Sequence, residues 1–182
     1  MKKLVVSLIS VLVLSTVSFA QSRDTGLFVG AQAGMNMGLN GKPFVDRVNS
    51  NFGAGVCGDF YAGYWFTSLL GVRAGYQGFS ISDTYVDFGY DTYSYIHADA
   101  LFRVYHSVIP YVHLGAVGVN NWSIGGGVGI MFPVAISKWV SLVPDFKATA
   151  FTPSVFAVSG ISPAFALSAS LGLVVNLDFL FK

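Results

Sequence analysis

The feature that most constrains the fold is a strict two-residue alternation near the end of the chain, from Phe165 to Phe181. Every odd position in this stretch is apolar, and most even positions between them are small or polar. Successive side chains of a strand point to opposite faces, whereas a helix would mix both sets on every face. The stretch also exceeds the roughly 5–6 residues of an ordinary soluble strand. It therefore predicts a long strand with one apolar and one polar face, as in a membrane-spanning barrel.

The same alternation recurs along the chain, which argues against the alternative that residues 163–182 close a soluble sandwich. It predicts an all-β fold, an eight-stranded antiparallel transmembrane β-barrel, with the even strand number of bacterial single-chain barrels. Proline cannot donate to a strand ladder, so we expect a bulge or break at Pro133 and at Pro144. The predicted strands are 26–39, 52–66, 70–80, 93–105, 111–119, 122–136, 139–151 and 163–182.

Composition points to a membrane but not to spanning helices. The hydrophobic content is 53% and the mean hydropathy is +0.61. Residues 104–137 and 148–176 contain no Asp, Glu, Lys or Arg, yet Gly, Pro, Ser and Asn interrupt both stretches. A spanning helix needs about 20 predominantly apolar residues in a row. The other structure that satisfies every backbone group in lipid is a closed barrel.

The first residues have the pattern of an export signal. Lys2 and Lys3 precede an apolar stretch, and small residues end it at Ala20. This pattern predicts a signal peptide over residues 1–20, cleavage before Gln21, and one outer-membrane barrel domain over residues 21–182. The predicted links after the first, third and seventh strands are long, and most of the others are short. Because short turns belong on the periplasmic side, we expect both termini there.

Charge and cysteine content narrow the possible partners. Without Lys2 and Lys3 the chain has eight basic and nine acidic residues, and no basic patch indicates nucleic acid. The single Cys57 forms no intramolecular disulfide, and no Cys/His spacing indicates a metal or another cofactor. We expect contact with outer-membrane lipid and lipopolysaccharide, and with the barrel-assembly machinery during insertion. The predicted outer loops are 40–51, 82–92 and 152–162, of which the middle one, with three Asp, is the candidate for an unidentified extracellular ligand.

Parity along the predicted strands places six charged side chains in the lumen, three of each sign. An unpaired charge in a tight interior is costly, so we expect these groups to pair. Eight strands leave an interior just wide enough for side chains, which favours a closed polar plug. The alternative is a narrow channel for ions or small solutes. The six residues are Asp59, Arg73, Asp99, Arg103, Asp145 and Lys147.

Aromatic residues near the predicted strand ends predict two belts at the membrane interfaces. The periplasmic belt contains Trp65, Phe66, Tyr105, Tyr111, Trp139, Phe179 and Phe181, and the outer belt contains Phe52, Tyr93, Tyr95, Trp122, Phe151 and Phe165. The glycines of residues 125–129 lack phosphate-loop spacing, so we expect them to make room for bulky neighbours inside the barrel.

An enzymatic role is the remaining alternative, because some small barrels modify lipid A with His and Ser. Such a site needs a nucleophile, a base and an orienting group in reach of one another. His97 and His113 face inward by parity, and no outward Ser–His pair occurs at the outer edge. We therefore expect no catalytic residue and a non-enzymatic structural or surface-interaction role, with a lipid A-modifying enzyme as an alternative.

Four short motifs resemble successive signatures of a known family: GYWFT at 63–67, GVRAGY at 71–76, HADALF at 97–102 and PYV at 110–112. They are similar to the outer membrane protein beta-barrel domain family of Gram-negative bacteria, and to the transmembrane domain of outer membrane protein A. The resemblance implies a small outer-membrane barrel. The chain departs from the family in ending with Phe181-Lys182 rather than Phe, and we expect no peptidoglycan-binding domain or anchoring role.

Overall fold

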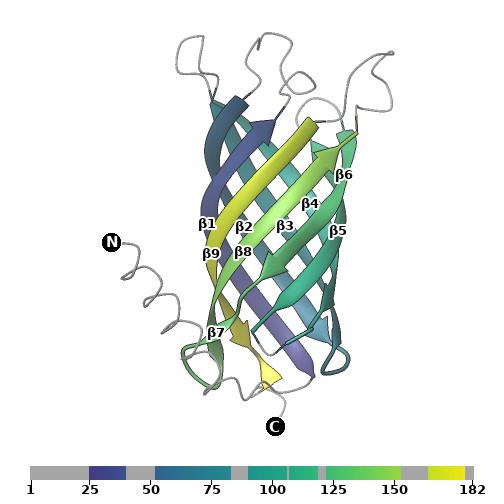
Figure 1. The fold of residues 1–182 in the computed structure, drawn as a ribbon, viewed down its shortest axis with the longest axis vertical. Helices are drawn as coiled ribbons and strands as arrows, with labels where there is room; N and C mark the ends of the chain where they lie inside the picture. The colour runs from purple at the N-terminus through teal and green to yellow at the C-terminus, as the bar shows by residue number, and fades with distance from the viewer. Residues whose placement is uncertain are drawn as a thin grey trace, which may run out of the picture.

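The computed structural model describes residues 25–39, 52–82, 90–105, 107–118, 122–152 and 164–178. Nearly all of this part of the chain is strand (Figure 1). The predicted signal peptide, the cleavage site and most of the predicted outer loops lie outside these residues. The strands are β1 Gly26–Leu39, β2 Phe52–Trp65, β3 Leu70–Ser82, β4 Tyr90–Phe102, β5 Ile109–Gly118, β6 Trp122–Met131, β7 Val134–Ala135, β8 Val140–Phe151 and β9 Ala164–Asn176.

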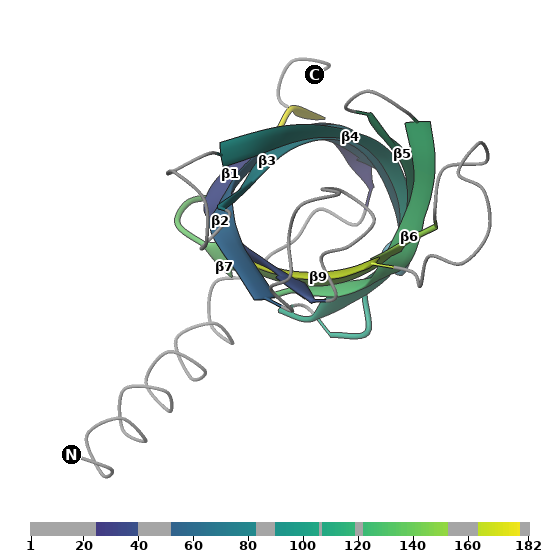
Figure 2. The same cartoon turned by 90° about the horizontal axis from the view of Figure 1, so that it is seen from above.

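The strands form one antiparallel sheet that closes on itself. Its order is β6-β5-β4-β3-β2-β1-β9-β8-β7, and an additional pairing of β6 with β8 joins the two edges. Viewed along its axis the sheet is a complete ring (Figure 2). β6 and β7 both pair with β8 in the same register, so they are two parts of one interrupted strand. The barrel therefore has eight strands, and the predicted fold is confirmed. In the part of the chain that is described, no helix is long and apolar enough to cross a membrane.

The two prolines behave differently from one another. The ladder breaks between Met131 and Val134, which confirms the interruption expected at Pro133. The break expected at Pro144 is wrong, because β8 continues through it in unbroken register with β9. The oxygen of Pro144 accepts a hydrogen bond from the nitrogen of Phe132 at 2.9 Å. Proline has no N–H to donate to the neighbouring strand. Its nitrogen lies opposite the gap between β6 and β7, where no ladder hydrogen bond is needed.

Most strand boundaries agree with the sequence pattern, but both ends of β4 are shifted. It covers Tyr90–Phe102 rather than residues 93–105, and β3 continues to Ser82, which pairs with Tyr90. Residues 82 and 90–92 are therefore strand rather than loop. The ladder extends there beyond the point where apolar alternation fades, because pairing with the neighbouring strand suffices to hold it. The last strand ends at Asn176 instead of reaching the chain end.

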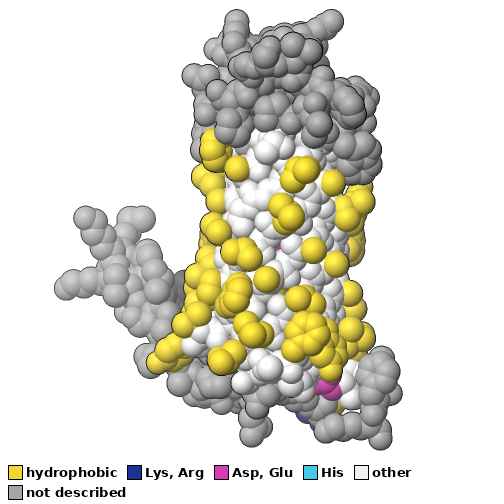
Figure 3. All heavy atoms as spheres, turned by 90° about the vertical axis from the view of Figure 1, so that its right-hand side faces the viewer, with side chains coloured by type: hydrophobic (Ala, Val, Ile, Leu, Met, Phe, Trp, Pro, Cys, Tyr) yellow, Lys and Arg dark blue, Asp and Glu magenta, His cyan; other side chains and the backbone are white. Residues whose placement is uncertain are grey.

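One end of the barrel, called here the turn-side end, carries the start of β1, the end of β9 and the β2–β3, β4–β5 and β7–β8 turns (Figure 1). The opposite end is called the loop-side end. Between them the outer wall is apolar (Figure 3). Large hydrophobic side chains such as Met35, Phe60, Leu114 and Leu171 are exposed on it. The buried charged groups lie in the interior of the barrel. A soluble protein has the opposite arrangement, with charged groups outside and apolar groups inside.

Candidate functional site

The candidate site is the lumen charge network, a set of buried polar side chains halfway along the strands. Every member sits at an inward-facing position, and its sequence neighbours point outward. All are nearly inaccessible to solvent. The members are Gln32 on β1, Asp59 on β2, Arg73 and Gln77 on β3, His97 and Asp99 on β4, Tyr111 on β5, and Asp145 and Lys147 on β8.

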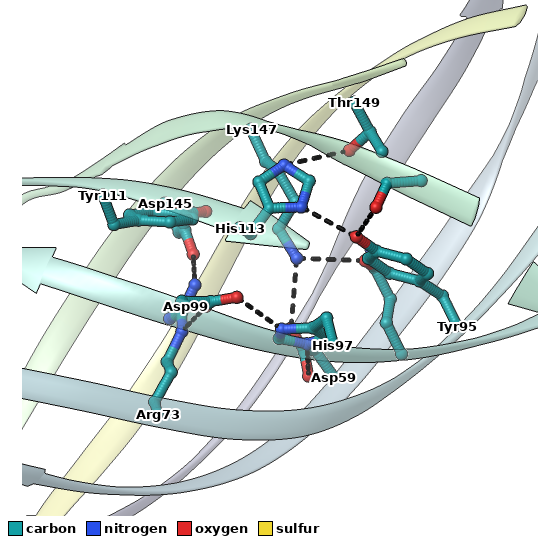
Figure 4. Close-up of polar contacts among 12 residues, drawn as sticks. Asp59, Arg73, Tyr95, His97, Asp99, Tyr111, His113, Asp145, Lys147 and Thr149 are labelled. Carbon is teal, nitrogen blue, oxygen red and sulfur yellow. Dashed lines mark hydrogen bonds and ion pairs between the residues drawn. The ribbon is translucent and has the colours of Figure 1, made fainter. Parts of the chain in front are cut away.

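Arg73 is the centre of the network (Figure 4). Its Nε forms an ion pair with Asp99, and its Nη2 lies 3.4 Å from Oδ2 of Asp145. Its guanidinium carbon is also 4.6 Å from the ring centroid of Tyr61 and 4.5 Å from that of Tyr111. The Tyr111 hydroxyl donates to Oδ1 of Asp145 at 2.7 Å. Arg73 is therefore held between two rings and two carboxylates, an arrangement suited to a planar, delocalised cation.

His97 links this centre to a second group of charges. Its Nδ1 is 2.7 Å from Oδ1 of Asp99, and its Nε2 is 3.2 Å from Oδ1 of Asp59. Lys147 approaches the other side of Asp59, with Nζ 3.4 Å from Oδ2, and donates to Oε1 of Gln77 at 3.0 Å. Both imidazole nitrogens thus face carboxylate oxygens, and a histidine donates from both only when it carries two ring protons.

The structure brings five of the six predicted lumen charges together but not Arg103. That residue follows the end of β4, near the turn-side end, and its guanidinium carbon is 3.9 Å from the ring centroid of Trp65. His97 is inward-facing by parity in the sequence, but it is not among the six predicted lumen charges. Its inward parity and its position two residues from Asp99 were the available signals. The network pairs Asp59, Asp99 and Asp145 with Arg73 and Lys147, and His97 adds a positive charge only when it is protonated on both ring nitrogens.

Apolar clusters lie in the lumen on both sides of the network. The turn-side cluster comes from strand ends near the short turns and consists of Phe28, Tyr61, Trp65, Leu101, Ile109, Tyr111, Met131 and Val143. The loop-side cluster comes from the opposite strand ends and consists of Cys57, Phe79, Tyr93, Tyr95, Val117, Phe151 and Ala166. Stacked and edge-on rings hold the loop-side cluster together, with Phe79 and Tyr93 at a centroid distance of 5.2 Å.

Small residues on the inner wall give the network its space. A Cβ added at Gly75 would lie 2.8 Å from Nε2 of His97, and one at Gly127 would lie 2.9 Å from Nε2 of His113. At Gly129 it would overlap the ring of Tyr111. These close approaches confirm that the inward glycines of residues 125–129 make room for bulky neighbours.

A smaller cluster, centred on His113, lies next to the network. The Tyr95 hydroxyl is 2.9 Å from Nδ1 of His113, and the Thr149 hydroxyl is 3.4 Å from Nε2. The pair of hydroxyl and imidazole has the residue types of a nucleophile and a base. However, Thr149 and His113 are both buried inside the barrel, and Phe151 packs against Tyr95 at 5.8 Å. The cluster therefore does not face the wall, where a lipid substrate would lie.

The predicted aromatic belts need correction. Trp65 is buried in the lumen, so its assignment to a lipid-facing belt is wrong. The same holds for Tyr93, Tyr95, Tyr111 and Phe151. Proximity to a strand end does not determine the face, whereas the parity that Trp65 shares with Asp59 does. Trp139 is half-buried at the β7–β8 turn, with Nζ of Lys138 5.1 Å from its ring centroid. The side chain of Trp122, and Phe179 and Phe181, lie outside the described residues.

Comparison with known proteins shows the fold. No protein-family model and no curated protein matches the chain. Among solved structures, neisserial surface protein A (NspA) matches at 18% identity and a TM-score of 0.59, covering 85% of this chain and 100% of that one. Ail, the attachment invasion locus protein of Yersinia pestis, matches at 15% identity and a TM-score of 0.51, covering 85% and 99%. Both are small outer-membrane barrels, and the similarity to outer membrane protein A stays a prediction.

Proposed function

We propose that this protein is a non-enzymatic outer-membrane β-barrel with a closed lumen, which acts through surface contacts of its outer loops. The observation that carries the proposal is the lumen charge network, paired internally and enclosed by an apolar cluster on each side. Charges paired with one another in this way are already occupied, so they are poorly placed to bind a passing ion or to react, and removing one partner leaves an uncompensated buried charge. With the lumen closed, the loop-side end is the surface through which the protein meets the outside.

Outer-membrane residence is supported by the apolar wall, by the barrel neighbours and by the predicted export signal. In the proposed orientation the turn-side end and both termini are periplasmic, which follows the usual placement of short turns. The partners are then outer-membrane lipid and lipopolysaccharide along the wall, with the barrel-assembly machinery acting during insertion. Ail, whose name refers to attachment and invasion, is an example of this fold in a surface-contact role.

A narrow channel is the second candidate, and one observation favours it. Among the described residues, the amide of Asn36 and the hydroxyl of Ser123 are buried without a hydrogen-bond partner, so water could enter the loop-side half of the lumen. The turn-side cluster would still close the path. We therefore expect no steady pore of porin size when the purified protein is placed in a planar bilayer. Stable conductance steps of that size would contradict the closed lumen.

The surface role predicts that adhesion depends on the outer loops and not on the lumen. Replacing residues 83–89 by a short Gly-Ser link is expected to reduce adhesion of expressing cells to host-cell or matrix surfaces. His113→Ala, at a lumen position remote from that loop in the sequence, serves as the matched control and should leave adhesion unchanged. Unchanged adhesion after loop replacement, with the barrel folded, would contradict a role for this loop. An altered lipid A mass spectrum on expression would instead support the enzymatic alternative.

A further inference from the structure

The apolar surface of the β3–β4 hairpin is too short to span a bilayer. Its outward pairs are apolar from Leu70–Phe102 up to Tyr76–Ile96, which is seven residues of β3. The next outward pair is Gly78–Ser94, where the Ser94 hydroxyl lies 2.8 Å from that of Tyr76. A membrane-spanning strand needs about 9–11 residues. The missing length must lie toward the turn-side end, because the wall becomes polar in the other direction.

Exposed apolar side chains continue in that direction beyond the strand ends. The β2–β3 turn carries Phe66 and Leu69, which are 58% and 61% exposed. The β4–β5 turn carries Val104 and Tyr105, which are 67% and 73% exposed. We call these four side chains the turn patch. Turns that face water usually carry charged and polar residues. Residues 66–70 contain Thr67 and Ser68 but no charged residue, and the charged Arg103 of the β4–β5 turn lies over the ring of the buried Trp65.

Four backbone N–H groups of the β2–β3 turn are hydrogen-bonded within the turn, which lowers the cost of placing it in lipid. The nitrogens of Phe66 and Thr67 donate to the oxygen of Leu70 at 3.0 and 3.2 Å. The Thr67 hydroxyl accepts from the nitrogens of Leu69 and Leu70 at 3.2 and 3.0 Å. The oxygen of Leu69 accepts from the nitrogen of Arg103 at 2.8 Å, which connects this turn to the next one.

The neighbouring β4–β5 turn is built in the same way. The nitrogens of Val104 and Tyr105 donate to the oxygen of Val108 at 3.2 and 3.4 Å, and the nitrogen of Val108 donates to the oxygen of Tyr105 at 3.1 Å. Few of its described backbone donors are left for water. The two turns therefore form one joined, apolar unit that continues the wall of the barrel.

We propose that the turn patch lies within the lipid of the turn-side leaflet, at the boundary between acyl chains and headgroups, and completes the span of β3–β4. The inference rests on the proposed function, since it assumes a membrane-embedded wall. The occupant is lipid because the patch is continuous with the lipid-facing surface of Leu70 and Phe102. These two turns of the periplasmic, turn-side end then lie in the membrane interface and not in the water beyond it.

Site-directed fluorescence measures this depth. Single cysteines at Leu69, Tyr105, Leu114 and Thr152 are introduced into a Cys57→Ala background and labelled with a polarity-sensitive fluorophore. The proteins are folded into phosphatidylcholine vesicles with or without acyl-chain nitroxide lipid, and the heat-modifiable gel shift confirms folding. Leu114 lies on the exposed wall, and Thr152 lies beyond β8 at the loop-side end, so they are the lipid and water controls.

The expected result is that labels at Leu69 and Tyr105 emit at blue-shifted wavelengths, lose emission to nitroxide lipid as the Leu114 label does, and resist aqueous iodide. If Leu114 is quenched while Leu69 and Tyr105 behave like Thr152, the inference is wrong and the membrane barrel stands. If Leu114 is not quenched either, the proposed membrane location fails with it. Efficient dimer formation by a bis-maleimide at Leu69→Cys would assign the patch to a second copy and overturn the lipid assignment.

Discussion

Replacing Arg73 by leucine is expected to lower the free energy of unfolding by about 3–5 kcal/mol. The guanidinium forms ion pairs with Asp99 and Asp145, and its removal leaves two buried carboxylates without this cation, between two apolar clusters. It also removes the cation from between the rings of Tyr61 and Tyr111. Equilibrium urea titration of the vesicle-folded protein, followed by tryptophan fluorescence, measures the change.

Met131→Leu is the matched control for this variant. Met131 accepts a hydrogen bond from Nη1 of Arg73 at 3.0 Å, so the substitution disturbs the same neighbourhood without removing a charge. A swap of similar volume is expected to cost less than about 1.5 kcal/mol. The double variant Arg73→Leu with Asp99→Asn should recover part of the loss, because one unpaired carboxylate is neutralised. Equal losses for Arg73→Leu and Met131→Leu would contradict the central place of the arginine.

Trp65→Ala is expected to destabilise the barrel by about 3–5 kcal/mol, the usual range for a buried tryptophan or phenylalanine. The indole is buried in the turn-side cluster, with the ring of Phe28 at 6.1 Å and the guanidinium of Arg103 over its face. Its removal leaves a cavity in the turn-side cluster. The same urea titration measures the loss.

Trp139→Ala provides the comparison, since both tryptophans were expected in the same belt. Trp139 is only half-buried, at a turn, so its removal should cost clearly less. Equal losses would indicate that Trp65 contributes no more than an interfacial residue. Intrinsic fluorescence distinguishes the two residues as well. Nitroxide lipid should quench the emission of Trp139, which remains in Trp65→Ala, more than the emission of Trp65, which remains in Trp139→Ala.

The two-residue period determined by itself which face each side chain takes. Asp59 and Phe60 are adjacent, yet one is buried in the lumen and the other is exposed on the wall, as alternation requires. The period also established the bounds of β1, because the outward side chains are apolar along the full length of that strand. It likewise established the number of strands. Closure then follows, since an apolar, two-faced sheet in lipid has no way to leave an edge unpaired.

Only the tertiary structure decided which inward residues meet. His97 and Arg103 belong to the same stretch and share its inward parity, but His97 faces Asp59 while Arg103 lies over Trp65. Parity specifies the face and leaves the height along the barrel axis open. That height depends on the register of each strand with both neighbours and on the residue at which a turn ends the strand. β4 ends at Phe102, and the nitrogen of Arg103 then donates to the oxygen of Leu69 in the neighbouring turn. Register is a property of paired strands, and a single strand's sequence does not contain it.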